Sequence, residues 1–199
     1  MRRILFLFTL LLLPVFGYTQ FLPKDIQGND VKQCEDGGFI VAGNRLLKRT
    51  DRNGNLLWEK TLSTDSSSLS SVQITNDGGF ILAGKQGYNT YNENCLTKTD
   101  RNGNLLWEKK YAEGEANSVQ ITSDGGFILA GHTSRYIRNY KKKIINLLKT
   151  DRYGNLIWQE VYEEGIASSV QITSDGGFIV AGKHNNFIKI DSIGNKLWN

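Results

Sequence analysis

Asp51, Asn53 and Asn55 place oxygen-bearing side chains on three alternate residues of the nonapeptide Thr50–Trp58, TDRNGNLLW. The same nonapeptide recurs unchanged at Thr99–Trp107. Alternating oxygens of this kind are typical of the beginning of a calcium-binding loop. A bound Ca²⁺ takes about six to eight oxygen ligands, usually from several carboxylates. Each copy here supplies a single carboxylate.

Comparison with two later, less regular copies favours a turn over a metal site. The position of Asn53 is Tyr153 in the third copy and Ile193 in the fourth, and neither side chain supplies a comparable oxygen ligand. The Asp and Gly that a tight hairpin needs are present in all four copies. We therefore predict a hairpin turn here, and we expect neither a metal nor a cofactor in this chain.

Other residues capable of chemistry do not form a recognisable catalytic pattern. The two histidines, His132 and His184, each follow an Ala-Gly pair, and no Cys/His cluster has zinc spacing. Glu163 and Glu164 resemble the acid and base of glycoside cleavage in type only. Adjacent residues of a strand point to opposite faces, so they would not converge on one bond. We assign no catalytic residue.

The first residues predict export. Arg2 and Arg3 precede the apolar run Ile4–Leu13, which is too short to span a bilayer and is followed by small residues. We predict a signal peptide over residues 1–19, with a lead-in over 20–29, and a secreted or periplasmic location. Removing two arginines and no acid lowers the net charge from +4 to +2. Such a charge gives no reason to expect nucleic acid as a partner, and no later segment predicts a membrane span.

The remaining chain is built from four repeats. Asp-Gly-Gly-Phe begins at Asp36, Asp77, Asp124 and Asp175, and each copy is followed by the Asp-x-x-Gly-Asn motif and a tryptophan. Each repeat holds four short apolar runs of strand length, separated by turn residues. Four antiparallel strands in about 45 residues describe one blade of a β-propeller. We predict an all-β propeller domain over residues 30–199, with blades at about 30–60, 69–109, 117–161 and 168–199.

The repeat, DGGF-I-L-A-G followed by K-T-D-x-x-G-N-x-x-W, resembles repeats of bacterial secreted β-propeller proteins. The Gly-x-x-x-Trp spacing is also similar to the tryptophan-docking motif of quinoprotein-like propellers. That resemblance implies that a tryptophan of each outer strand packs between blades. The residues concerned are Trp58, Trp107, Trp158 and Trp198. No quinone-binding residue of those propellers can be matched here.

Four blades leave the closure of the ring open. Three arrangements are compatible with the repeats: a closed four-blade ring, two chains pairing into an eight-blade ring, and an open arc that is a fragment of a longer ancestor. An arc would expose strand edges and apolar faces, so we favour the closed ring or the homodimer. In either propeller, Cys34 and Cys95 would lie near opposite faces, about 17 Å apart. That separation exceeds disulfide reach, so we expect two free thiols.

Variation in length directs the search for function to one face. From each Asp-Gly-Gly to the following Asp motif, the spacing is 15, 23, 27 and 16 residues. The added residues lie between the second and third strands, on the face that also carries the connections between blades, and such variable segments commonly carry function. The candidate binding residues on this face are Tyr88, Tyr91, Asn92, His132, Arg135, Tyr136, Arg138, Tyr140, Lys141 and Lys142.

We therefore predict a secreted, non-catalytic binding or scaffold module whose partner is a glycan or an extracellular protein. A carbohydrate-active hydrolase and a purely structural repeat segment remain as alternatives. Convergent carboxylates in a cleft would favour the hydrolase. The basic run Ser134–Lys143 has two interpretations: a contact for an anionic partner, or a solvated hairpin extension in which Tyr136 and Tyr140 pack on their neighbours.

Overall fold

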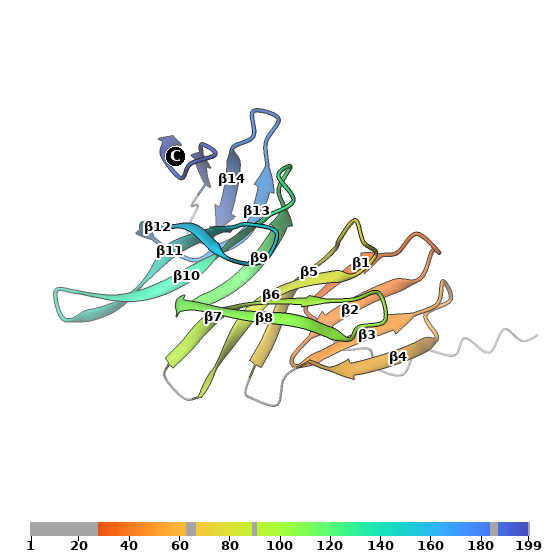
Figure 1. The fold of residues 1–199 in the computed structure, drawn as a ribbon. Coiled ribbons are helices and arrows are strands. Elements are labelled where there is room, and N and C mark those ends of the chain that lie inside the picture. Colours follow the sequence, from red (N-terminus) through yellow and green to blue (C-terminus); the bar gives the residue numbers. More distant parts are fainter. Residues whose placement is uncertain (1–27, 63–66, 89–90, 184–186, 199) are drawn as a thin grey trace, which may run out of the picture.

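The structure is a computed structural model that describes residues 28–62, 67–88, 91–183 and 187–198. These residues form sixteen β-strands and no helix (Figure 1). The predicted signal peptide and His184 lie outside the described residues. The described part contains no helix long and apolar enough to cross a membrane.

The strands form four sheets, which we call the first to fourth blades. The first blade contains β1 (Asp30–Gln33), β2 (Phe39–Gly43), β3 (Leu46–Thr50) and β4 (Leu56–Thr61). The second contains β5 (Ser67–Ile74), β6 (Phe80–Tyr88), β7 (Tyr91–Thr99) and β8 (Leu105–Glu113). The third contains β9 (Glu115–Ile121), β10 (Phe127–Ile137), β11 (Tyr140–Thr150) and β12 (Leu156–Glu164). The fourth contains β13 (Ala167–Ile172), β14 (Phe178–Gly182), β15 (Phe187–Ile190) and β16 (Lys196–Trp198).

Each blade is a four-stranded antiparallel sheet with its strands in chain order. The predicted fold class, a propeller of four such blades, is confirmed. The blades pack in succession: β1 and β2 contact β5, β5 to β7 contact β9, and β9 and β10 contact β13. The first strand of every blade therefore lies on the inside of the assembly (Figure 1).

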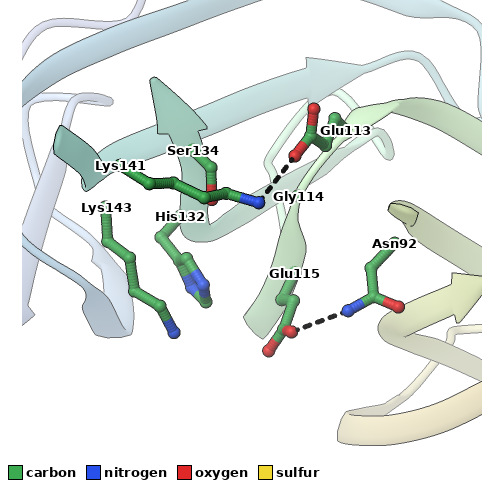
Figure 2. A pocket seen from close by; sticks show the side chains of 8 residues that line it. All are labelled: Asn92, Glu113, Gly114, Glu115, His132, Ser134, Lys141 and Lys143. Atoms are coloured by element: carbon green, nitrogen blue, oxygen red, sulfur yellow. Dashed lines mark hydrogen bonds and ion pairs between the residues drawn. The ribbon is translucent and has the colours of Figure 1, made fainter. Parts of the chain in front are cut away.

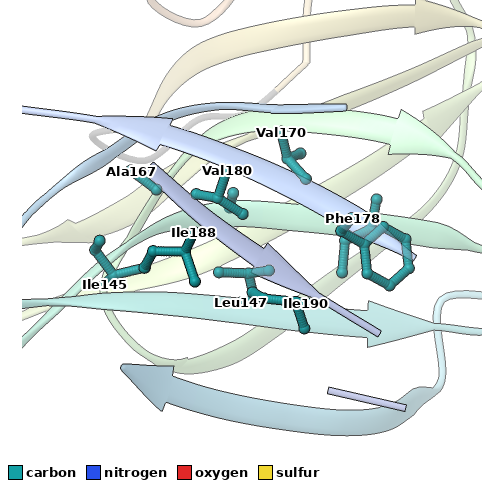
Figure 3. Packing of buried hydrophobic residues seen from close by; sticks show 10 residues of the cluster. Ile145, Leu147, Ala167, Val170, Phe178, Val180, Ile188 and Ile190 are labelled. Carbon is teal, nitrogen blue, oxygen red and sulfur yellow. The ribbon is translucent and has the colours of Figure 1, made fainter. Parts of the chain in front are cut away.

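The apolar core is divided among the three interfaces between blades. Between the third and fourth blades, Ile145 and Leu147 pack with Val170, Phe178 and Val180, all of them buried (Figure 3). Equivalent clusters join the first blade to the second and the second to the third. Both faces of an inner blade are thus covered, which explains why its second strand begins with a continuous apolar run, Phe80–Gly84 in β6 and Phe127–Gly131 in β10.

The Asp-x-x-Gly-Asn motif forms the hairpin turn between the third and fourth strands. In the first blade, one carboxylate oxygen of Asp51 accepts hydrogen bonds from the Asn53 amide at 2.8 Å and the Asn55 amide at 2.9 Å. The other accepts from the Asn55 side chain at 2.8 Å. The carboxylate that suggested a calcium ligand is therefore used inside the turn.

The inner strands present a polar groove of about 260 Å³ that runs across all four blades. Small side chains line it, among them Ser71, Ser118 and Ser169, as expected for the crowded centre of a propeller. Gln73 reaches from the second blade to the Val119 carbonyl of the third at 3.1 Å. The groove therefore also helps to join neighbouring blades.

The chain does not close a ring by itself. Among the described residues, no extensive packing joins the first blade to the fourth, and the blades form an open arc (Figure 1). The expectation of a ring closed within one chain is therefore wrong, while half of a larger ring fits. Trp198, predicted as a fourth docking residue, instead lies against Phe187 of its own blade, with ring centroids 5.6 Å apart.

Candidate functional site

Two long hairpins build the face on which sequence analysis placed the candidate residues. β6 pairs with β7 out to Tyr88 and Tyr91, and β10 pairs with β11 out to Ile137 and Tyr140. The hairpins β2–β3 and β14–β15 of the end blades are about half as long. The segments that vary in length are therefore largely extended strand rather than loop. This extension carries side chains of the second and third blades beyond the apolar core.

A cleft of about 330 Å³ opens between these two blades (Figure 2). The second blade contributes Asn92 and Glu113, and Gly114 connects it to the third. The third blade contributes the remaining lining residues, which are Glu115, His132, Ser134, Lys141 and Lys143. Two carboxylates and two lysines balance the formal charge of this lining. The cleft therefore suits a polar ligand without a strong net charge.

Glu115 is fixed by two donors from the second blade. Its Oε1 accepts from Lys85 Nζ at 2.8 Å and from Asn92 Nδ2 at 2.9 Å. Burial alone would raise the pKa of Glu115, but the hydrogen bond and charge of Lys85 outweigh it and lower that pKa. Glu115 is consequently an ionised acceptor at neutral pH, held in one orientation.

Glu113 and Lys141 face each other across the upper part of the cleft, with Oε1 and Nζ 3.8 Å apart (Figure 2). Both side chains are close to half exposed. An ion pair of this kind is screened by water and holds its partners weakly. Either side chain is therefore able to exchange this contact for one with a ligand.

His132 is the buried polar residue of the cleft. It is 5% exposed, and its Nδ1 has no hydrogen-bond partner among the described residues. Burial, followed by the charge of Lys143, lowers its pKa against the opposite effect of Glu115. The imidazole is therefore neutral at neutral pH. A buried polar atom left without a partner costs about 1–3 kcal/mol, so a ligand that reaches this nitrogen gains an unused interaction.

The cleft joins only some of the predicted residues. Asn92, His132 and Lys141 line it, whereas Lys142 forms an ion pair with Glu164 at 2.8 Å. Arg135, Tyr136, Arg138 and Tyr140 lie at the tip of the β10–β11 hairpin. Only the backbone of Tyr88 and Tyr91 is described, as the last pair of β6–β7.

The tip of the β10–β11 hairpin is solvated. Tyr136 and Tyr140 are 76% and 72% exposed, so the expectation that they pack on neighbouring side chains is wrong. The ladder of β11 with β12 ends at the pair of Ile144 and Glu164, so the hairpin extends beyond the fourth strand of its own blade (Figure 1). Two exposed tyrosines beside Arg135 and Arg138 form a second surface able to contact a partner.

Sequence analysis did not include Glu113 or Glu115 among the candidate binding residues, and it considered Ser134 and Lys143 only as the two ends of the basic run. The signal was available in Glu113-Gly114-Glu115, which places two acids around the glycine at a connection between blades. Two tyrosines near the connections between blades serve the fold. Tyr111 and Tyr162 donate to the Gly154 and Gly194 carbonyls of the following blades at 2.8 and 2.9 Å.

Neither cysteine forms a disulfide, as expected. Cys95 is buried and burial raises its pKa to about 12, so its thiol is unreactive at neutral pH. Glu163 and Glu164 bind different lysines, Lys196 at 3.0 Å and Lys142 at 2.8 Å, and do not act as a pair. The described residues contain no group of three His, Cys, Asp or Glu side chains suited to a metal ion.

Three of the solved structures that share the fold illustrate the similarity. The WD40 β-propeller domain of Doa1 matches with a TM-score of 0.60 and 17% identity, over 81% of this chain and 49% of that one. A protein of unknown function from Bacteroides caccae matches with a TM-score of 0.57 and 17% identity, over 79% and 55%. Sqt1 of Chaetomium thermophilum, bound to the N-terminus of ribosomal protein L10, matches with a TM-score of 0.56 and 13% identity, over 81% and 45%.

These similarities establish the propeller fold but neither a family nor a function. The chain spans about half the length of each of the three structures. No protein-family model matches the sequence, and no curated protein matches it.

Proposed function

We propose that this chain is an exported, non-catalytic binding module whose ligand site is the cleft between the second and third blades. Our first candidate for the ligand is a glycan. The observation that carries the proposal is His132, a buried neutral imidazole with an unpartnered nitrogen in a polar cleft. The signal-peptide pattern of the first nineteen residues supports export.

The lining suits hydroxyl groups better than an apolar ligand. Glu115 is a fixed acceptor, and Lys141 and Lys143 are donors that reach the same space. Asn92 and Ser134 supply both kinds of group. A sugar ring presents closely spaced hydroxyls, each of which can donate and accept a hydrogen bond. These hydroxyls match the mixture of donors and acceptors in the cleft lining. Because the lining charges balance, a neutral glycan fits better than a strongly anionic one.

A protein segment is the second candidate, and the exposed hairpin tip favours it. Exposed tyrosines and arginines are enriched in protein interfaces, and Tyr136, Tyr140, Arg135 and Arg138 gather at this tip. Among the similar propellers, Sqt1 binds the N-terminus of a ribosomal protein. The cleft and the tip lie on the same long hairpin, so one extended peptide would be able to contact both.

A hydrolase requires a carboxylic acid held protonated near neutral pH. The lowered pKa of Glu115 is the opposite of that requirement. Glu113 is half exposed and forms an ion pair with Lys141, so it does not lie in the apolar surroundings that such an acid needs. We therefore favour either binding function over a hydrolase.

The test is a panel of neutral and acidic oligosaccharides, followed by calorimetric titration of those retained. Glu115→Gln removes the ionised acceptor and should weaken binding of a neutral glycan by about tenfold or more, as for loss of a hydrogen bond to a charged group. Glu164→Gln changes an exposed acid outside the cleft and is the matched control.

Binding that is equal in both variants would exclude the cleft as the site. Retention of no oligosaccharide at millimolar concentration would exclude a glycan and direct the search to peptides. Release of shorter sugars during incubation would show that the protein is catalytic. Amino-terminal sequencing of exported protein tests the predicted cleavage after residue 19 or nearby.

A further inference from the structure

The two ends of the arc carry the two halves of the contact that joins neighbouring blades. At each internal interface, the tryptophan of one blade packs on a phenylalanine and a turn glycine of the next. Trp58, for example, lies 6.3 Å from Phe80, centroid to centroid, and covers Gly103. The first blade has the receiving residues, Phe39 and Gly54, without a preceding tryptophan.

The receiving face of the first blade forms an apolar socket. A cavity of about 340 Å³ lies there, and Val31, Phe39, Val41 and Gly54 line it. The other lining residues are Gly28, Asn29, Asp30 and Thr50. Val31 is 53% exposed, whereas its equivalents in the other blades, Val72, Val119 and Val170, are all 0% exposed. The difference arises from position alone, since each of these three valines is covered by the preceding blade.

The opposite end of the arc presents the complementary surface. Trp198 is 49% exposed and Phe187 is 51% exposed. Residues equivalent to Phe187 in the other blades, Leu47, Leu96 and Leu147, are fully buried against the next blade. The fourth blade therefore ends in an uncovered tryptophan and an uncovered apolar face.

A hydrogen-bond series along the inner strands is open at the same two places. Ser71 Oγ accepts from the Val119 amide, and Ser118 Oγ accepts from the Val170 amide, each at 3.3 Å. Ser169 holds the next position, at the free end of the arc. At the other end, the Val31 amide donates to the side chain of Asp30, its own neighbour, at 2.8 Å.

We propose that two copies of this chain join head to tail into one closed ring. Trp198 of each copy enters the socket formed by Val31, Phe39 and Gly54 of the other. The Val31 amide of each copy lies opposite Ser169 of the other. A second copy is the occupant because both faces are those that this chain already buries against itself three times. This chain covers about half of each solved propeller that it resembles, and a second copy would supply further blades.

Sedimentation velocity of the purified chain tests this proposal. The expected species has twice the mass of one chain and does not grow further with concentration. Trp198→Glu removes the inserted residue and Val31→Glu charges the socket. Each should raise the dissociation constant at least about a hundredfold, as for a hot-spot residue. Ile157→Glu, at a position 56% exposed on the outer strand of an inner blade, is the matched control and should remain dimeric.

Mixing the two monomeric variants distinguishes this arrangement from a face-to-face dimer. The Trp198→Glu chain keeps an intact socket and the Val31→Glu chain keeps an intact tryptophan, so an equimolar mixture should regain a dimer. Circular dichroism establishes that each variant is folded, and if Trp198→Glu does not fold, Val31→Glu decides alone. A monomeric wild type, a dimer indifferent to both variants, a mixture that stays monomeric, or polymers of increasing length would each overturn the proposal.

The proposal is independent of the cleft, which lies between the second and third blades. A failure of ring closure would leave glycan binding to a single chain untouched. A failure of glycan binding would likewise leave the mass of the particle unchanged.

Discussion

Trp107 of the second blade packs against Phe127 of the third, with ring centroids 6.2 Å apart and an interplanar angle of 53°. The same pairing joins Trp58 to Phe80 and Trp158 to Phe178 at 6.3 and 6.2 Å. Tilted aromatic pairs at this separation contribute about 0.5–1.5 kcal/mol beyond the area they bury. Each interface between blades is thus organised around one aromatic pair.

Trp107→Ala should lower the free energy of unfolding by about 2–4 kcal/mol. The estimate lies below the full range for a buried tryptophan because Trp107 is only partly buried. Urea unfolding followed by circular dichroism measures the change. Leu106→Ala alters the neighbouring residue, which is 55% exposed, and should shift the free energy by about 0.5 kcal/mol or less. Equal effects of the two substitutions would contradict a docking role for Trp107.

Gly103 lies under Trp58 in the hairpin turn of the second blade, with φ of +76°. A Cβ at this position would meet the Trp58 ring at 2.6 Å. Gly125 has a φ of +79° and nothing within 4 Å of the equivalent Cβ. Gly125→Ala should therefore show only the backbone cost, about 1–2 kcal/mol. Gly103→Ala should cost about 1–3 kcal/mol more, as for overpacking.

Urea unfolding of both glycine variants checks this difference. Tryptophan fluorescence provides a second measurement, because of the two substitutions only Gly103→Ala should displace an indole, that of Trp58. If the two variants are equally stable, the close approach of Gly103 and Trp58 does not contribute to the interface.

The repeating units, their strand content and their turns could be predicted from sequence because each depends on contacts within about fifty residues. Turn chemistry and strand patterns recur four times, which separates them from a chance match in a single copy. The same comparison decided that the Asp-x-x-Gly-Asn motif is a turn and not a calcium site. Asp51 and Gly54 have counterparts in every copy, whereas Asn53 does not.

Closure of the ring could not be predicted because it depends on the rotation between blades, summed over three interfaces. Val31 and Val72 occupy the same place in the repeat, yet one is 53% exposed and the other 0%. Their exposure differs because a preceding blade covers Val72 and none covers Val31. The cleft was missed in part for a similar reason, since Asn92, Glu115 and His132 come from two blades and meet only because the blades are adjacent.

In the second and third repeats, the lysine of the Lys-Thr-Asp segment forms an ion pair with the aspartate of the Asp-Gly-Gly turn. The spacing of the motifs in the sequence did not reveal this contact. Lys98 contacts Asp77 of the Asp-Gly-Gly turn at 2.9 Å, and Lys149 contacts Asp124 at 2.8 Å. Both lysine side chains are less than a tenth exposed. The two motifs of each repeat are therefore held together by an ion pair within the blade.

This pairing predicts that the protein loses stability at acidic pH. Partial burial would raise the pKa of Asp77, but hydrogen bonds from Thr75, Lys98 and the Gly79 amide outweigh it and lower the pKa to about 2. In the unfolded chain an aspartate has a pKa of about 3.9. The ionised form is thus favoured by folding, so this contribution is complete above about pH 4 and is lost as the pH falls towards 2.

Urea midpoints measured between pH 2 and 6 check this dependence. Asp77→Asn should be less stable than the wild type at pH 6, and the difference should shrink as the pH falls, because protonation of the wild-type carboxylate removes the same interaction. The slope of the free energy of unfolding against pH gives the number of protons taken up on unfolding. In Asp77→Asn this number should fall by at most about one, because Asp124 keeps its own ion pair with Lys149. Lys98→Gln should produce the same convergence at low pH. A stability gap that stays constant from pH 6 to pH 2 would mean that Asp77 acts through its shape in the turn and not through its charge.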